Sequence, residues 1–297
     1  MKEKTDEHQE LDEVTRYLLT LKEDVKPPEG FEVNYIQLSD GGKVRHLRFV
    51  PENPIAQVIL IPGLNTLLMS WYKFLLLLQK ERFQIDYVET REKRTSILKK
   101  AKSITYERLI QDVKEAYEKV NEQGLKTVAL GSSMGANLIL LSLARQEIDP
   151  DFAVLVGPLL DFHIPKFFKF VSPFLNRVTF TIIKPIAWWF VLPRFLNKEK
   201  DPFQAHKYEL GFKLGDATKM KYAFKSWAGT TLREDLPKIN GKKTQVVLIG
   251  AEEDKLHAAD ETKKIAEMTE NAMYIDLKTN FAAHDQPLVD LLKELVS

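Results

Sequence analysis

The sequence contains no cysteine. This absence excludes disulfide bonds, thiolate metal sites, iron–sulfur clusters and a cysteine nucleophile. The chain also lacks an uncharged apolar run of about eighteen residues, the length that a membrane-spanning helix needs. Its first ten residues are mostly polar and lack the apolar core of a secretory signal. We therefore expect a soluble, cytoplasmic protein, or one that is peripheral to a membrane.

An excess of charge of either sign is missing too. The 43 Lys and Arg residues nearly balance the 42 Asp and Glu residues, so the formal net charge is +1. Composition therefore gives no electrostatic reason to expect a nucleic-acid partner. The length of 297 residues allows one large α/β domain with an insertion, or two ordinary domains.

Short apolar runs that alternate with helix-like segments indicate a mostly parallel sheet flanked by helices. The expected strands are 57–61, 83–88, 126–130, 151–156, 244–249 and 272–277, and the expected helices are 67–79, 103–120, 136–145, 259–268 and 287–296. Before them, residues 31–38 and 43–50 alternate apolar and polar side chains around an Asp-Gly-Gly turn, which predicts an antiparallel hairpin. Residues 1–24 are expected to form a polar helix.

The apolar run at 126–130 leads into Gly131-Ser-Ser133-Met134-Gly135 and then into an apolar helix. This G-x-S-x-G pattern is typical of a nucleophile elbow, in which glycines let strand and helix approach closely while the serine sits in a strained turn. We predict that Ser133 is a nucleophile and that the N–H of Met134 faces an oxyanion. A purely structural turn is the alternative, but the strand–turn–helix context favours catalysis.

A serine hydroxyl needs a general base, and the base needs an acceptor that fixes its tautomer. Only His284, among six histidines, follows a late strand in a short loop before the closing helix, and His257 is its main competitor. The strand at 244–249 leads into an acidic loop, in which we favour Asp254 as the acid and keep Glu253 as the alternative. The order Ser, Asp, His is the one expected when the three residues follow successive strands of such a sheet.

Two further loops follow early strands. Pro62-Gly63-Leu64 comes directly after the strand at 57–61, and its glycine permits a tight loop whose amides can face a ligand. An ordinary strand-to-helix turn is the alternative. The segment from Arg91 to Lys102 is locally rich in positive charge, and we expect a solvated loop there. The alternative is a loop near the mouth of the site that favours an anionic head group or a membrane surface.

From residue 159 the alternation of strands and helices stops for about seventy residues, the size of an inserted subdomain. This segment is aromatic and basic, and prolines at 165, 173, 185 and 193 break it into short helices. Three interpretations stay open. The segment can be a helical cap whose apolar face covers the active site, a patch that makes peripheral membrane contact, or a subdomain whose aromatic residues form its own core.

The chain resembles the α/β-hydrolases over about residues 31 to 297. The resemblance rests on four features, namely Gly131–Gly135, Pro62–Leu64, the loop at 250–256 and His284. Within them it is most similar to the capped group of esterases, monoacylglycerol lipases and lysophospholipases. The resemblance implies an α/β-hydrolase core at 31–158 and 231–297, a helical cap at 159–230 and a polar leader at 1–30. It also implies an oxyanion hole made by the backbone N–H groups of Leu64 and Met134, with no metal or organic cofactor.

Two departures from that family pattern lie around the site. Pro62-Gly63 stands in place of the usual His-Gly, and Glu89-Thr-Arg-Glu-Lys-Arg94 replaces the usual glycine-containing loop. The expected function is a serine hydrolase that cleaves small carboxylic esters with an apolar acyl chain, such as a monoglyceride or a lysophospholipid, through an acyl-enzyme. An amide or peptide hydrolase of the same fold and a non-catalytic scaffold that binds a lipid or a partner remain the alternatives.

Overall fold

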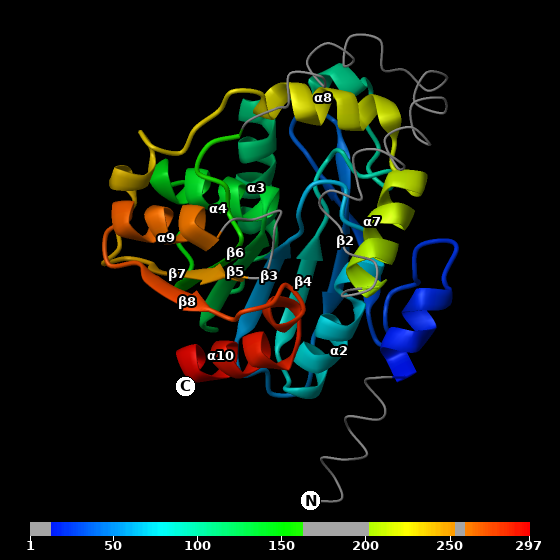
Figure 1. Cartoon of the computed structure of the whole chain (residues 1–297), viewed down its shortest axis with the longest axis horizontal. Coiled ribbons are helices and arrows are strands. Elements are labelled where there is room, and N and C mark those ends of the chain that lie inside the picture. The colour runs from blue at the N-terminus through cyan, green and yellow to red at the C-terminus, as the bar shows by residue number, and fades with distance from the viewer. Residues whose placement is uncertain (1–12, 163–201, 253–258) are drawn as a thin grey trace, which may run out of the picture.

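The computed structural model describes residues 13–162, 202–252 and 259–297 (Figure 1). An eight-stranded sheet lies at its centre, in the order β1-β2-β4-β3-β5-β6-β7-β8, with helices on both faces. This architecture confirms the α/β fold class that the sequence predicted.

The strands are β1 (Glu32–Gln37), β2 (Lys43–Phe49), β3 (Gln57–Ile61), β4 (Gln84–Val88), β5 (Thr127–Ser132), β6 (Phe152–Val156), β7 (Gln245–Gly250) and β8 (Met273–Asp276). The described α-helices are α2 (Tyr72–Lys80), α3 (Tyr106–Val120), α4 (Met134–Ala144), α7 (Pro202–Leu214), α8 (Ala217–Trp227), α9 (Ala259–Met268) and α10 (Gln286–Val296). Short 3-10 helices are η1 (Leu68–Ser70), η2 (Ala101–Ser103), η5 (Leu236–Lys238) and η6 (Ala282–His284). Residues 13–20 are also helical, within the segment predicted as a polar helix.

The sheet begins with the predicted hairpin, because β1 pairs antiparallel with β2. Strand β2 is also antiparallel to β4, whereas the pairs from β4 and β3 through to β7 and β8 are parallel. Strands β3 and β4 are buried at every position, as expected where helices cover both faces of a sheet. Parallel strands bring their carboxyl ends to one edge, so the loops after β3, β5, β7 and β8 all begin there.

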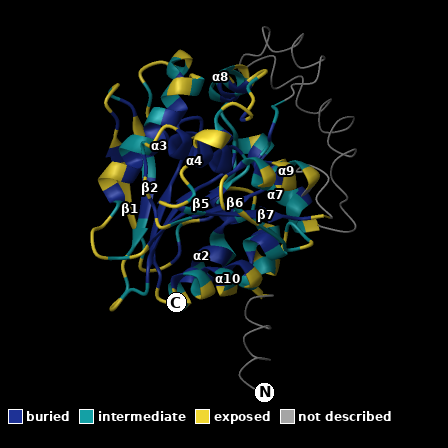
Figure 2. Cartoon of the chain, turned by 90° about the vertical axis from the view of Figure 1, so that its left-hand side faces the viewer, coloured by how far each residue is buried: buried dark blue, intermediate teal, exposed yellow. Residues whose placement is uncertain are grey.

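Side chains alternate between two apolar layers along the parallel strands. On one face, Ile59 and Ala129 belong to the layer that contains apolar residues of α3, α4 and α9. On the other face, Val58 and Val128 belong to the layer that contains residues of α2 and α10. Figure 2 shows the strands buried between these helices. Every residue of α4 is buried, which explains why its sequence is almost entirely apolar.

The expectation of a solvated loop from Arg91 to Lys102 is wrong for its first part. Arg91 and Glu92 are 0% exposed and Lys93 is 5% exposed, whereas Lys99 and Lys102 are exposed. The buried cations of this segment pair with carboxylates: Arg91 pairs with Asp40 and Asp112, and Lys93 pairs with Glu92 of the segment itself. These pairings make burial of the cations possible.

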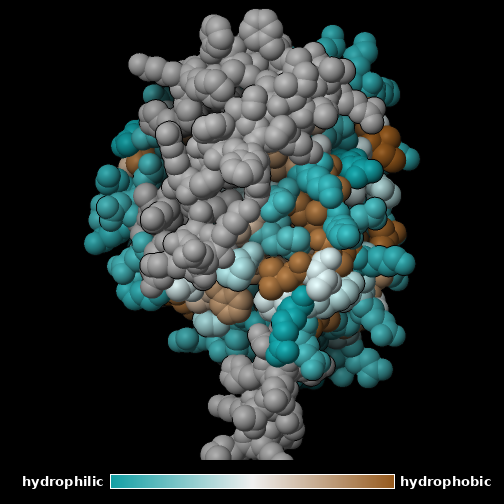
Figure 3. Space-filling model, turned by 45° about the vertical axis from the view of Figure 1, so that its right-hand side comes forward, coloured by the Kyte–Doolittle hydropathy of each residue, from teal (hydrophilic) through white to brown (hydrophobic). Residues whose placement is uncertain are grey.

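No helix within the three described ranges is both long and apolar enough to cross a membrane. On the face drawn in Figure 3, polar side chains break up the apolar surface of the described residues.

Glu115 connects α3 to the turn between β1 and β2. Its carboxylate accepts hydrogen bonds from the backbone N–H of Ser39 (2.8 Å) and from the Ser39 hydroxyl (2.6 Å), and it pairs with Arg108 (2.7 Å). Burial alone would raise the pKa of Glu115, but hydrogen bonds from Ser39, Arg108 and Gln111 outweigh burial and lower the pKa to about 2.

We predict that Glu115→Gln lowers the free energy of unfolding at pH 7 by about 1–2 kcal/mol, because the amide loses charge-assisted hydrogen bonds. The folded-state pKa lies below the ordinary value of 4.5, so the carboxylate stabilises the fold above that value and loses this effect as the pH falls towards about 2. Urea unfolding at pH 7 and pH 3 should show a smaller difference between wild type and variant at pH 3. Glu118→Gln, at an exposed position of the same helix, is the control and should change little at either pH. An equal loss for Glu115→Gln at both pH values would contradict the prediction.

Candidate active site

Ser133 lies in the turn between β5 and α4, as the motif predicted. Its φ of 51° and ψ of −118° fall in a sparsely populated region for a residue other than glycine. The N–H of Ser133 donates to the carbonyl oxygen of Val156 at 2.8 Å, which ties the strained turn to the end of β6. A strained turn of this kind presents the serine hydroxyl at the edge of the sheet.

The two glycines of the motif allow the chain to pack closely around this turn. A Cβ on Gly135 would lie 2.1 Å from the carbonyl oxygen of Ile61, and a Cβ on Gly131 would lie 2.7 Å from Cα of Ala136. Both distances are too short for real side chains, so neither site tolerates even alanine without movement. The first turn of α4 therefore rests directly on the end of β3.

A cavity of about 370 Å³ lies at the carboxyl edge of the sheet, and Ser133 and His284 both line it. Gly63 and Leu64, from the loop after β3, line the same cavity. The helices α7 and α8 contribute mainly apolar and aromatic side chains to its wall, namely Tyr208, Phe212, Met220 and Phe224. The structure thus brings together residues that are widely separated in the sequence.

His284 ends η6, in the loop between β8 and α10. Its Nδ1 lies 2.8 Å from the backbone carbonyl oxygen of Asn280. A carbonyl oxygen can only accept, so this contact places the imidazole proton on Nδ1 and makes Nε2 the nitrogen that can take up a proton. The indole ring of Trp71 lies against the imidazole, with ring centroids 4.6 Å apart. These contacts hold the imidazole ring of His284 in place beside the cavity.

The residue after His284 anchors this loop. Asp285 pairs with Lys73 of α2 at 2.6 Å and accepts a hydrogen bond from the N–H of Gln286 at the start of α10. No sequence motif pointed to Lys73 or Trp71, because each acts through a contact between distant segments. The sequence contained only a weak indication of Asp285: aspartate is a preferred N-cap residue, and Asp285 is the N-cap of α10.

The predicted acids Asp254 and Glu253, and the competing base His257, lie outside the described residues. Strand β7 ends at Gly250, which is paired with Asp276 at the end of β8. The loop that carries the acids therefore begins at the same edge of the sheet as the loop that carries His284. The identity of the acid stays a prediction.

The predicted oxyanion-hole residues flank Ser133. Met134 is the first residue of α4, where a helix leaves its N–H groups without intrahelical partners. A Cβ on Gly63 would lie 3.4 Å from Cβ of Ser133, so the loop that carries Leu64 packs against the elbow. A backbone donor on each side of a serine is the arrangement that acyl-transfer chemistry uses.

The model of one protein family, the serine aminopeptidases S33, matches residues 53–274. The chain belongs to this family of α/β-hydrolases. No protein of curated function matches the sequence significantly.

Solved structures of α/β-hydrolases share the fold of this chain at low sequence identity. An esterase from Exiguobacterium antarcticum is 15% identical with a TM-score of 0.72, and the match covers 89% of this chain and 99% of the esterase. An enol-lactonase from Burkholderia xenovorans is 18% identical with a TM-score of 0.68, covering 89% and 98% of the two chains. A carboxylesterase from Bacillus subtilis is 16% identical with a TM-score of 0.63, covering 97% and 96%.

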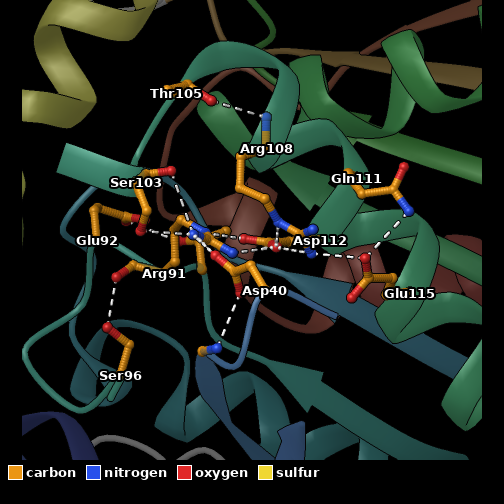
Figure 4. A network of polar contacts seen from close by, with 12 residues as sticks. Asp40, Arg91, Glu92, Ser96, Ser103, Thr105, Arg108, Gln111, Asp112 and Glu115 are labelled. Atoms are coloured by element: carbon orange, nitrogen blue, oxygen red, sulfur yellow. Dashed lines mark hydrogen bonds and ion pairs between the residues drawn. The ribbon is translucent and has the colours of Figure 1, made fainter. Parts of the chain in front are cut away.

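This α/β-hydrolase has a buried charged loop beside its elbow, which sequence analysis missed. Figure 4 shows the Arg91 guanidinium between Asp112 and Asp40. Its Nη2 lies 2.6 Å from Asp112, and its Nη1 lies 3.0 Å from Asp40 and 3.1 Å from the Ser103 hydroxyl. Burial raises the pKa of Asp112 despite these contacts, whereas the Arg91 and Gly42 hydrogen bonds outweigh burial at Asp40 and lower its pKa. Arg91 thereby fixes the loop after β4 to the middle of α3 and to the turn that carries Asp40.

We predict that Gly135→Ala lowers the free energy of unfolding by about 2–3 kcal/mol, because the added methyl group meets the end of β3. Alanine is otherwise the better helix former, so steric overlap is the only cause available. Gly124→Ala is the control, since that glycine has a φ of 94° and no atom within 4 Å of the added Cβ. It should cost about 1 kcal/mol, from backbone strain alone. Urea unfolding measures both, and wild-type stability of Gly135→Ala would disprove the close packing.

Proposed function

We propose that this chain is a serine hydrolase of carboxylic esters, with Ser133 as the nucleophile and His284 as the general base. One observation carries the proposal: a serine in a strained strand-to-helix turn shares a cavity with a histidine whose Nδ1 is held by a carbonyl oxygen. Asp254 is the proposed acid that supports the histidine, and Glu253 is the alternative.

The reaction proceeds in two halves. Ser133 attacks the ester carbonyl while Nε2 of His284 takes the hydroxyl proton and passes it to the leaving alcohol. Water, which His284 deprotonates, then attacks the acyl-enzyme. The bond from the acyl carbon to Oγ of Ser133 breaks, the carboxylic acid is released, and His284 returns the proton to the serine oxygen. The N–H groups of Leu64 and Met134 stabilise the oxyanion in both halves, each contributing about 3 kcal/mol to transition-state binding.

The apolar and aromatic side chains on the wall of the cavity favour a substrate with an apolar acyl chain. Described residues 202–227 place Tyr208, Phe212 and Phe224 on it, which fits the proposal that the segment 159–230 is a cap over the site. The volume of about 370 Å³ is small for a ligand site, for which roughly 300–1,000 Å³ is usual. We therefore expect a preference for a short or medium acyl chain.

The family description names aminopeptidases, whose substrates carry an ammonium group. Recognition of that group calls for a carboxylate near the nucleophile. Among the described residues that line the cavity there is no Asp or Glu, and Lys207 contributes a positive charge instead. This lining favours an ester over a peptide with a free amino terminus.

The aromatic segment from 163 to 201, which the sequence linked to membrane contact, lies outside the described residues. The scaffold alternative gains no support from the site. A binding protein has no use for a serine held in a strained conformation, which costs about 1–3 kcal/mol.

The test is intact-mass analysis after treatment with a fluorophosphonate, followed by hydrolysis of p-nitrophenyl esters of increasing chain length. We expect one adduct on the wild type, no adduct on Ser133→Ala, and a fall in kcat of roughly 10³-fold or more for His284→Ala. Ser226→Ala is the matched serine control, because Ser226 lies in α8 but does not line the cavity, and this variant should react like the wild type. An unreactive wild type that is correctly folded would overturn the proposal.

A further inference from the structure

Two buried charged residues of the loop after β4, Glu92 and Lys93, contact the backbone of the loop that carries Leu64. The ammonium of Lys93 donates to the carbonyl oxygen of Gly63 and pairs with Glu92 at 2.9 Å. The Glu92 carboxylate in turn accepts a hydrogen bond from the backbone N–H of Asn65 at 3.1 Å. Glu92 is 0% exposed and Lys93 is 5% exposed. The pair therefore contacts the peptide groups on both sides of Leu64.

The carbonyl oxygen of Gly63 accepts from the Lys93 ammonium and, at 3.3 Å, from the backbone N–H of Thr66, and these contacts set which way the N–H of Leu64 points. The carbonyl of Gly63 and the N–H of Leu64 belong to one planar trans peptide, so they point in opposite directions. A donor that holds the carbonyl on the side of Lys93 therefore turns the N–H to the other side. Leu64 lines the cavity that Ser133 also lines.

We infer that Lys93 and Glu92 are positioning residues for the oxyanion hole. Lys93 fixes the orientation of the Gly63–Leu64 peptide, and Glu92 fixes the next peptide while neutralising Lys93. Neither residue touches the substrate. The inference rests on the proposed function, because it assigns the Leu64 N–H to the oxyanion.

Both loops also contact the helices α7 and α8, whose side chains line the cavity. The ammonium of Lys219 in α8 donates to the carbonyl oxygens of Lys93 (2.9 Å) and Ser96 (2.7 Å) and to the Ser96 hydroxyl (2.8 Å). Burial lowers the pKa of Lys219, as expected for an ammonium withdrawn from water. The side-chain amide of Asn65 donates to the carbonyl oxygen of Gly211 in α7 at 2.8 Å. The segment Gly63–Asn65 is thus bonded both to the loop after β4 and to α7.

A merely structural ion pair would behave differently from a positioning pair. Removing Lys93 alone leaves the Glu92 carboxylate buried with less compensation, which destabilises any fold. Removing both charges restores neutrality, yet the ammonium donor to Gly63 is still missing, and only the N–H of Thr66 (3.3 Å) is left on this carbonyl. The double variant Glu92→Gln with Lys93→Met therefore separates the two roles, because it recovers stability without recovering the orientation of the peptide.

The experiment measures kcat, KM and urea stability for Lys93→Met, Lys93→Arg, Glu92→Gln and the double variant, with a p-nitrophenyl ester as the substrate. We expect kcat to fall by roughly 10²-fold in Lys93→Met and in the double variant, with KM nearly unchanged, as for the loss of one oxyanion donor. Lys93→Arg keeps a cationic donor and should recover much of the activity. Glu92→Gln keeps an acceptor for the Asn65 N–H and should lose less than Lys93→Met.

An alkylboronic acid, which forms a tetrahedral adduct with an active serine, provides a second readout. Its inhibition constant should rise in the double variant by about the factor by which kcat/KM falls. Arg45→Met is the control for loss of a nearby, partly buried ion pair, since Arg45 pairs with Glu89 at 2.5 Å. It should lose stability but not the affinity for the boronic acid.

Two results would overturn the inference while leaving the proposed function intact. One is a double variant with wild-type kcat in an enzyme that requires Ser133. The other is a loss of kcat that follows stability across all variants, Arg45→Met included. An inactive wild type would instead count against the proposed function itself.

Discussion

The close contact between α4 and the end of β3 is the constraint on which the rest of the site depends. Gly135 lies so near the carbonyl of Ile61 that no side chain fits there. Because α4 sits this deep, the chain has to turn sharply between β5 and α4, and Ser133 takes up the strained φ of 51°. The strain is kept in place by the burial of α4 along its whole length, which ordinary backbone preferences cannot overcome.

Burial of charge is the second constraint. Where a glycine-containing loop was expected after β4, this chain has Glu89 to Arg94, and the first residues of that loop are withdrawn from water. Such burial is unfavourable unless each charge is paired and hydrogen-bonded. Arg91 meets this condition through Asp112 and Asp40, and Lys93 meets it through Glu92 and the Gly63 carbonyl. The buried charges Arg91, Glu92 and Lys93 therefore cannot move without leaving a partner buried alone.

The sequence predicted the fold well because the signals for it are local. A run such as 57–61 is apolar at every position since both of its faces are covered, and the structure has β3 at those residues. The G-x-S-x-G pattern located the elbow for the same reason, because glycine is required at two positions by contacts within and next to the turn. The shared cavity of Ser133 and His284 also followed from strand order alone, through the common edge of a parallel sheet.

What escaped prediction depends on pairing between distant segments. Lys73 with Asp285 and Arg91 with Asp112 look like ordinary surface charges in the sequence, where a charged run usually indicates solvent exposure. The net charge of a segment says nothing about the carboxylates that other segments bring to it. Burial of the loop after β4 therefore could not be predicted from its own sequence, because it depends on carboxylates from α3 and from the turn that carries Asp40.

The two constraints meet at the Gly63–Leu64 peptide. Ser133 packs against this loop from one side, and the Lys93 ammonium contacts its carbonyl from another. A cation on the carbonyl oxygen draws electron density along the peptide, which makes the N–H at the other end a stronger donor. Lys93 and Glu92 are both buried, so water screens this polarisation less than it would at the surface, although the Glu92 carboxylate offsets part of it. If the Leu64 N–H binds the oxyanion as proposed, Lys93 both orients that donor and strengthens it before a negative charge develops on the substrate oxygen, so no rearrangement is needed when the charge appears.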